Sequence, residues 1–245
     1  MSQHLPRFRV AQPLADGALV TLDGDELRHA RARRLAIGEA LALFDGAGFS
    51  CVGVVDSVGR HAVRVRVTAL RPPNANESPL ALTLAVGLPK GDKLDWIVEK
   101  ATELGVTALQ PFASAHTLGV ASAARRARWD QIALAAAKQC GRSQVPAIHA
   151  ALGFDALLAV AAELRLVLAE RGAAQPLAAA GGGARPTSLL VTVGAEGGFS
   201  DAELAAAHAA GFTLVTLGPR TLRAETAAIV AAALCQAHWG DLDSR

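Results

Sequence analysis

Two glycine-containing loops late in the chain hold the residues best suited to chemistry. Gly194-Ala-Glu-Gly-Gly198 and Gly218–Arg223 each follow an apolar run that predicts a strand and each precede a predicted helix. Loop amides and a helix N-terminus both attract negative charge, so this arrangement suits an anionic or nucleotide ligand. A plain strand-to-helix turn is the alternative for the first loop. Neither loop matches a dinucleotide fingerprint or a P-loop.

The elements that position these loops alternate between strand and helix. Strands are predicted at Leu80–Val86, Ala108–Phe112, Leu164–Ala169, Ser188–Val193 and Thr213–Leu217, and helices at Asp92–Gly105, Ala124–Cys140, Ser200–Gly211 and Ala224–Trp239. This order predicts an α/β fold with a mostly parallel sheet, which binds ligands at the carboxyl ends of its strands. The last helix is apolar nearly all round, which indicates burial in a core or in a subunit interface.

The chain before Arg71 has a different texture. A turn sequence, Asp45–Gly48, separates two apolar runs and predicts a hairpin, and Val63, Val65 and Val67 alternate with arginines as in a half-buried strand. Residues 72–79 have linker composition. The predicted domains are therefore 1–71 (β), 72–79 (linker) and 80–245 (α/β).

Charge is unevenly distributed along the 245 residues. The net charge is only +2, which argues against binding polyanions by bulk charge. By segment it is +2 for residues 1–79, +3 for 80–150 and −3 for 151–245. The excess of basic residues in 1–150 is compatible with local phosphate contact. Each arginine cluster taken alone is more typical of a solvated helix face.

The cysteines and the N-terminal residues argue against several further classes of protein. Three separated cysteines without a C-x-x-C pair predict neither a disulfide framework nor a metal site. The first residues carry no apolar signal core, and no run is long and apolar enough for a membrane span. The expectation is a cytoplasmic protein with no metal and no membrane partner.

Five segments, in order along nearly the whole chain, resemble one family. They are Leu5–Val10, Gly87–Lys93 with Glu99–Gly105, Lys138–Ser143, Gly194–Ser200 and Leu217–Ala227. They resemble the bacterial RsmE family, small-subunit ribosomal RNA uridine N3-methyltransferases of the SPOUT class. Two positions depart from the family, which usually has Pro at Ala195 and Thr at Ala224. Because neither departure touches a Gly or Arg position of the loops, activity is expected to survive.

The resemblance implies a fold that periodicity does not predict. A small PUA-like β-barrel for RNA is expected at residues 1–71, followed by a SPOUT-type domain with a trefoil-knotted parallel sheet. The implied cofactor is S-adenosylmethionine, and the implied assembly is a homodimer whose interface includes the last helix. The implied substrate is small-subunit ribosomal RNA, within an assembled or nearly assembled 30S subunit, methylated at the m3U1498 site.

The resemblance also assigns residues. Cofactor contacts are expected from Leu168, Gly194, Glu196, Gly197, Gly198, Leu217, Gly218, Leu222, Arg223 and Ala227. RNA contacts are expected from Arg7, Arg9, Arg31, Arg33, Arg34, Lys90, Arg142 and Arg220. The catalytic candidates are Arg223, Glu196 and Arg142.

The reaction explains why arginine and glutamate are candidates. Uracil N3 carries a proton and becomes nucleophilic only when that proton leaves, and a guanidinium can stabilise the charge that then builds on O2 and O4. Glu196 has several roles open to it: binding the cofactor, orienting an arginine, accepting the N3 proton, or acting as an anion at the following helix N-terminus.

Other functions remain as alternatives. A different SPOUT enzyme would methylate another base atom or a ribose 2′-hydroxyl. A non-catalytic RNA-binding module would need the basic residues of 1–150 but not the glycine loops. A nucleotide-dependent oxidoreductase is weaker, because no dinucleotide fingerprint follows any predicted strand.

Overall fold

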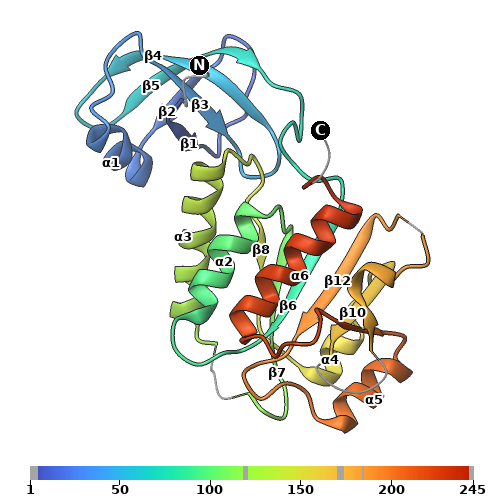
Figure 1. The fold of residues 1–245 in the computed structure, drawn as a ribbon. Coiled ribbons are helices and arrows are strands. Elements are labelled where there is room, and N and C mark those ends of the chain that lie inside the picture. Colours follow the sequence, from blue (N-terminus) through green and yellow to red (C-terminus); the bar gives the residue numbers. More distant parts are fainter. Residues whose placement is uncertain (1–4, 118–120, 170–173, 184, 243–245) are drawn as a thin grey trace. The chain divides into compact units, whose positions relative to one another are not determined.

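The structure, a computed structural model, describes residues 5–117, 121–169, 174–183 and 185–242 (Figure 1). Its contacts divide the chain into unit 1, residues 1–77 with 137–145, and unit 2, residues 78–136 with 146–245. The division after Glu77 lies inside the segment that composition predicts as a linker. Residues 137–145, expected in the α/β domain, belong to unit 1, because Glu77 accepts hydrogen bonds from the Ser143 and Gln144 amides.

Unit 1 is a five-stranded sheet with one helix. Its elements are β1 (Arg7–Arg9), β2 (Leu19–Leu22), α1 (Gly24–Ala32), β3 (Ala40–Phe44), β4 (Ser50–Val58) and β5 (Val63–Leu70), with strand order β1-β3-β4-β5-β2. The predicted hairpin is present: β3 and β4 pair antiparallel, and the Asp45 carboxylate accepts hydrogen bonds from the Ala47 and Phe49 amides in the turn.

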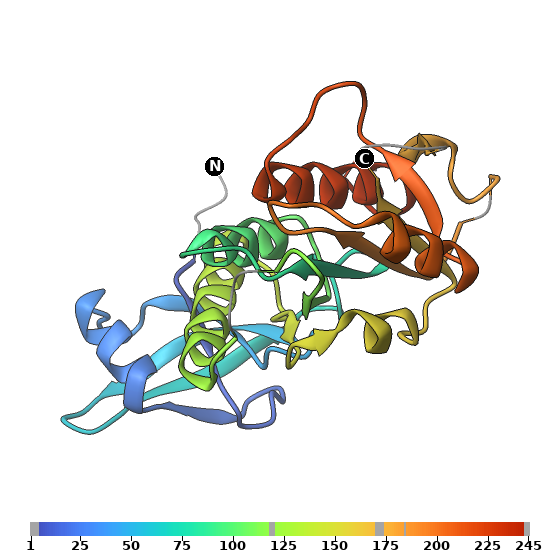
Figure 2. The ribbon, with the colours of Figure 1, turned by 90° about the horizontal axis from the view of Figure 1, so that it is seen from below.

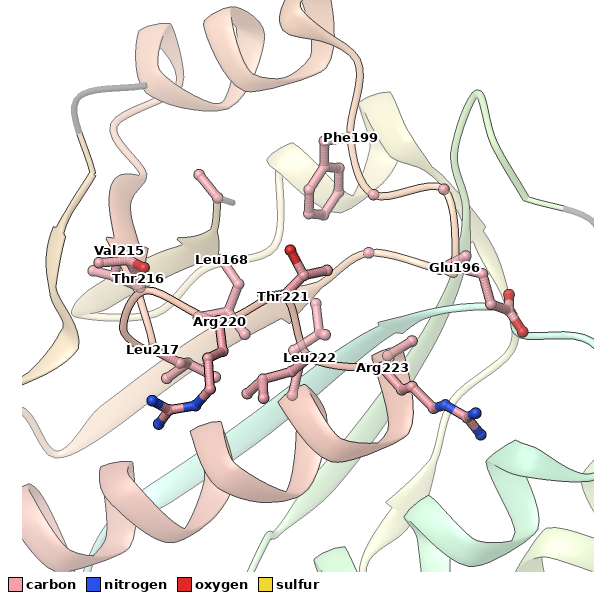
Figure 3. Close-up of a pocket in the computed structure, with 18 of the residues that line it drawn as sticks. Leu168, Glu196, Phe199, Val215, Thr216, Leu217, Arg220, Thr221, Leu222 and Arg223 are labelled. Atoms are coloured by element: carbon pink, nitrogen blue, oxygen red, sulfur yellow. The ribbon is translucent and has the colours of Figure 1, made fainter. Parts of the chain in front are cut away.

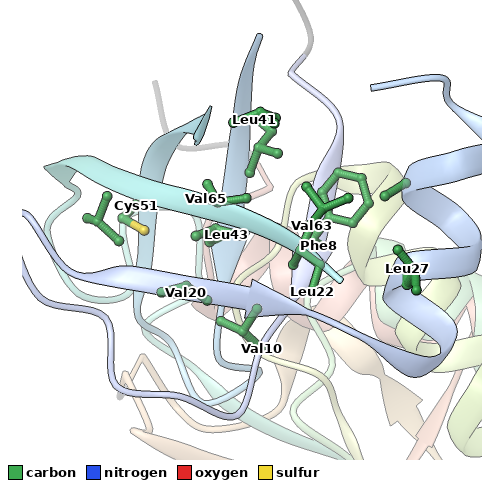
Figure 4. Close-up of a cluster of buried hydrophobic side chains, with 13 residues drawn as sticks. Phe8, Val10, Val20, Leu22, Leu27, Leu41, Leu43, Cys51, Val63 and Val65 are labelled. Atoms are coloured by element: carbon green, nitrogen blue, oxygen red, sulfur yellow. The ribbon is translucent and has the colours of Figure 1, made fainter. Parts of the chain in front are cut away.

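The core of unit 1 comes from alternating strand residues. Val63, Val65 and Val67 are buried while Arg64 and Arg66 are exposed, so the half-buried strand is confirmed. These valines join Phe8, Leu22 and other apolar side chains in the cluster that the curled sheet surrounds (Figure 4). Leu27 of α1 closes one side of this cluster.

Unit 2 is an α/β domain whose sheet is parallel throughout the part of the chain described. Its elements are β6 (Ala81–Gly87), α2 (Lys93–Glu103), β7 (Ala108–Ala113), α3 (Ala123–Cys140, whose last turn belongs to unit 1), β8 (Ala147–Ile148), β9 (Leu152–Gly153), α4 (Phe154–Leu158), β10 (Leu164–Leu168), β11 (Gln175–Pro176), η1 (a 3₁₀ turn, Leu177–Ala179), β12 (Ser188–Val193), α5 (Asp201–Ala209), β13 (Thr213–Thr216) and α6 (Ala224–Trp239). The strand order is β11-β13-β10-β12-β6-β7-β8, with β9 paired to β7, and all of these pairings are parallel. The predicted parallel sheet is therefore confirmed.

Helices cover both faces of this sheet (Figures 1 and 2). On one face α6 packs on β6 and β12 and beside α2. On the other, α4 and α5 bury Leu157 and Ala207 against strand residues that include Val167 and Leu190. Since β10, β12 and β13 run in the same direction, the loops that follow them emerge at one edge of the sheet.

Two predicted helix starts have different local chemistry. Ser200 and Glu203 form a capping box at the start of α5, with each side chain bonded to the other residue's amide. Asp92 immediately precedes α2 as predicted, but its side chain makes no capping hydrogen bond, because its backbone is not in the extended conformation that a cap requires.

The last helix buries only part of its apolar surface within the chain. Ala228, Ala231, Ala232 and Cys235 are fully buried, and burial raises the pKa of the Cys235 thiol to about 12. Leu234, in contrast, is 42% exposed. None of the helices described is both long and apolar enough to cross a membrane.

Candidate active site

A cavity of about 670 Å³ lies at the edge of the sheet where the loops after β10, β12 and β13 emerge (Figure 3). Its size is typical of a site for a small organic ligand. Its walls are the end of β10, the loop after β12, the loop after β13 and the first turn of α6.

The residues expected to contact the cofactor lie together around this cavity. All ten of them line it: Leu168, Gly194, Glu196, Gly197, Gly198, Leu217, Gly218, Leu222, Arg223 and Ala227. They come from parts of the chain up to 59 positions apart, so the strand order brings them together. Their contact with a cofactor stays a prediction.

The cavity also contains residues that the sequence reasoning did not select. These are Lys93, Ala169, Val193, Ala195, Phe199, Asp201, Leu204, Val215, Thr216, Pro219, Thr221 and Ala224, with Arg220, which was expected to contact RNA instead. Most of them adjoin selected residues in the chain. Lys93 does not adjoin any of them, and the one sequence signal for it is its place in the Gly87–Lys93 segment that resembles the family.

The loop after β12 is held close to its neighbours. Gly198 adopts φ +64° and its amide donates to the Ala195 carbonyl, which closes a tight turn. A Cβ on Gly87, at the end of β6, would stand 2.5 Å from the Ala195 nitrogen. A Cβ on Gly197 would stand 2.6 Å from that of His116. Backbone therefore approaches backbone at Gly87, and the His116 side chain approaches backbone at Gly197, at distances that leave no room for a Cβ.

The loop after β13 turns the chain from the sheet into α6. Gly218 has φ +107°, and its amide donates to the Thr216 hydroxyl. Arg223 occupies the N-cap position of α6, and no side chain caps the first amides of α6, which have no intrahelical partner of their own. Ala224 and Ala227 of this first turn line the cavity. This end of the cavity suits a carboxylate or another anionic group.

Three charged side chains meet beside the cavity. Lys93 Nζ lies 2.8 Å from Glu196 Oε1 and 3.6 Å from Glu225 Oε2. The Lys90 amide also donates to Glu196 Oε1, at 3.3 Å. Burial alone would raise the pKa of Glu196, but the hydrogen bonds from Lys93 and from backbone amides outweigh it and lower that pKa below its usual value. The same hydrogen bond raises the pKa of Lys93.

The arginines near the cavity are accessible. Arg220 and Arg223 both line it and are exposed, and Figure 3 shows them leaving the loop in different directions. Lys90, expected to contact RNA, is exposed beside Glu196. Arg220 and Arg223 thus place exposed cationic groups at the cavity, and Lys90 places another beside Glu196.

The expected RNA-binding arginines of unit 1 fall into two groups. Arg9, Arg31, Arg33 and Arg34 are exposed, the last three at the end of α1 or just beyond it. Arg7 and Arg142 are instead 7% and 4% exposed. Arg142 Nε donates to Glu77 at 2.8 Å, and Arg7 Nη2 donates to the Arg142 carbonyl at 2.8 Å.

This burial bears on the roles expected of Arg7 and Arg142. Desolvation lowers the pKa of Arg7, which lies over the ring of Phe44. One carboxylate oxygen of Glu77 accepts a hydrogen bond from Arg142, and the other accepts hydrogen bonds from two backbone amides. Both arginines are therefore held inside unit 1 by these interactions, and their contact with RNA stays a prediction.

In the described part of the chain, no group of three or more His, Cys, Asp or Glu side chains is placed so that it could hold a metal ion. The three cysteines are free thiols.

Comparison with known proteins identifies related chains. Family models described as an RNA methyltransferase domain and an RNA methyltransferase PUA domain match residues 76–236 and 22–68. The protein named Ribosomal RNA small subunit methyltransferase E from Synechocystis is 34% identical over 93% of this chain and 76% of its own length. The Bacillus subtilis protein of the same name is 31% identical over 90% of both chains.

Solved structures agree over almost the whole chain. A Ribosomal RNA small subunit methyltransferase E from Neisseria gonorrhoeae, bound to S-adenosyl methionine, has a TM-score of 0.89 with 34% identity over 97% of this chain and 99% of that one. A putative methyltransferase from Legionella pneumophila, also with bound cofactor, has a TM-score of 0.87 with 30% identity, over 97% of this chain and 99% of that one.

Proposed function

Because the chain belongs to the ribosomal RNA small subunit methyltransferase E family, of the SPOUT class, we propose that it methylates N3 of a uridine in small-subunit ribosomal RNA. The methyl donor is S-adenosylmethionine and the target is the m3U1498 site. The observation that carries the proposal is the cavity: all ten residues expected to contact the cofactor line one space of about 670 Å³.

The residues around the cavity fit this cofactor. Leu168, Leu217 and Leu222 offer an apolar surface for an adenine ring, and the amides of the two glycine loops suit its polar edges. The uncapped start of α6 favours the carboxylate of the methionine part. When bound, the cofactor supplies an electrophilic methyl group on a sulfonium.

The protein's own residues have to hold the uracil and manage its charge. Methyl transfer forms a bond to N3 and breaks the bond from carbon to sulfur, and the N3 proton leaves to an acceptor. We assign to Arg223 the stabilisation of the negative charge on the uracil oxygens, since it is exposed, always cationic and at the cavity. Arg220 and Lys90 hold the phosphates of the flanking nucleotides.

Unit 1 supplies an RNA-binding surface of its own. The exposed cations of this surface are Arg9, Arg31, Arg33 and Arg34. The proposed substrate is the assembled or nearly assembled 30S subunit in the cytoplasm. Arg7 and Arg142 support the surface from within, through Glu77 and the Arg142 carbonyl. The knotted course of the chain around α6 is part of the same proposal.

The first experiment measures cofactor binding and the product. Calorimetry with S-adenosylmethionine should show one site per chain. Mass-spectrometric mapping of 16S RNA should show N3-methyluridine in cells with this protein and unmodified uridine in cells without it. A different modified nucleoside would indicate another SPOUT activity. Absence of cofactor binding would contradict the proposed activity and favour the alternative of a non-catalytic RNA-binding module.

We also propose a homodimer through the outer face of α6. Leu234 is 42% exposed, and Ile229, Val230 and Ala233 beside it are only partly buried within the chain. An apolar stripe on a helix of this kind is typical of a subunit interface.

Sedimentation should detect loss of the dimer in Leu234→Asp, because a buried carboxylate without a partner opposes association. Leu19→Asp in β2 is the matched control, since Leu19 is similarly exposed at 44%. The control should sediment as the unsubstituted protein does. A dimer that survives the Leu234 change unaltered would place the interface elsewhere.

A further inference from the structure

Lys93 connects the two loops that form the cavity. As the first residue of α2, it pairs with Glu196 in the loop after β12 and with Glu225 in the first turn of α6, which follows the loop after β13. Glu196 and Glu225 are 103 and 132 positions from Lys93, so no local sequence constraint holds the three together. Lys93 itself lines the cavity.

Glu225 depends on Lys93 for compensation of its charge. The Glu225 side chain is only 16% exposed, and its Oε2 atom has no hydrogen-bond partner among the described residues. Lys93, at 3.6 Å, is the cation paired with it. Without Lys93, two carboxylates would face each other across a partly buried space, and like charges there repel.

The chemistry of lysine suits this bridging position. Its ammonium is a compact charge with three donors, so it can lie between two carboxylates that approach from different elements. The carboxylate of Glu196 is held by this ammonium and by the Lys90 amide, and it is therefore already engaged in two hydrogen bonds. This engagement favours a structural role for Glu196 over that of acceptor for a substrate proton.

We propose that Lys93 is a positioning residue of the cofactor site: by pairing with Glu196 and Glu225 it sets the spacing of the two loops that bind S-adenosylmethionine. The proposal rests on the proposed function. It also assigns Glu196 a role that the sequence does not suggest, that of a loop anchor paired with Lys93. The proton acceptor for N3 is then a group other than Glu196.

The test compares Lys93 with a lysine in the same helix. Lys100 also bridges two carboxylates, Glu99 and Glu103, each at 2.8 Å, and its side chain is 31% exposed against 35% for Lys93. Lys100 does not line the cavity. Lys93→Met should weaken S-adenosylmethionine binding about tenfold or more in calorimetry, and Lys100→Met should leave it unchanged.

Two further variants separate positioning from general loss of structure. Lys93→Arg keeps the charge and should bind the cofactor within about threefold of the unsubstituted protein. Adding Glu225→Gln to Lys93→Met removes the repulsion and should recover part of the lost affinity. The Michaelis constant for the cofactor should rise in Lys93→Met more than the turnover number falls.

Equal affinity in Lys93→Met and Lys100→Met would overturn the inference. So would a loss that neither Lys93→Arg nor the Glu225→Gln addition reduces. If the unsubstituted protein itself fails to bind S-adenosylmethionine, the proposed function fails first, and that result is distinct because it precedes any comparison of variants.

Discussion

Replacing Arg142 with alanine is expected to destabilise unit 1 by about 3–5 kcal/mol, because it leaves a buried carboxylate without its counter-charge. The Arg142 and Glu77 side chains are 5% and 3% exposed and are joined at 2.8 Å. Glu77 also accepts the Ser143 and Gln144 amides, so the loop after α3 loses its main anchor when this ion pair is broken. Urea unfolding followed by circular dichroism measures the loss.

A second pair in the same unit provides the control. Arg66 and Asp56 are joined at the same 2.8 Å, but their side chains are 53% and 34% exposed. Arg66→Ala should therefore cost less than about 1 kcal/mol. Removing both charges, in Arg142→Met with Glu77→Gln, should recover part of the stability. Arg142→Ala with undiminished stability would show that Arg142 is not a structural residue, and its expected contact with RNA would regain priority.

The second large effect is expected at Gly87. Its Cβ position lies 2.5 Å from the Ala195 nitrogen and 3.1 Å from the Gly194 carbonyl carbon, and both are backbone atoms that cannot move independently of the loop. Gly87→Ala should therefore displace the Gly194–Gly198 loop and weaken S-adenosylmethionine binding about a hundredfold, or about 2.7 kcal/mol. Calorimetry at matched protein concentrations measures this change.

Gly153→Ala is the control for the Gly87 change. No atom lies within 4 Å of the Cβ position of Gly153, and its backbone angles are ordinary for any residue. This variant should bind the cofactor as the unsubstituted protein does. If Gly87→Ala also binds normally, the loop after β12 tolerates displacement, and the close approach of the two backbones has no functional importance.

Much of the fold was predictable from local patterns. The strand at Ser188–Val193 and the helix at Ala224–Trp239 have the predicted bounds, since an apolar run and a uniformly apolar helix are strong signals. Short elements were not predicted: α4 and β9 are stabilised by contacts with β7 and carry little periodicity of their own. The contacts between the loop after α3 and unit 1 could not be predicted, because its partner Glu77 lies 65 positions before Arg142.

The candidate site shows the same division. The glycine loops could be found from the sequence, because glycine between a predicted strand and a predicted helix has a direct conformational meaning. The role of Lys93 could not, since a lysine at a helix start looks like any solvated residue until its two carboxylate partners are known. The burial of Arg142 could not be predicted either, because it is not a property of its own sequence segment.

The sequence by itself determined the element types, the parallel sheet, the family and the two loops. These follow from local apolar periodicity, turn residues and five motifs in register. Only the tertiary structure decided which charges pair: Lys93 with Glu196 and Glu225 beside the cavity, and Arg142 with Glu77 inside unit 1. The physical reason is that a side chain's protonation, exposure and partners depend on its surroundings in space, and residues more than 60 positions away supply those surroundings here.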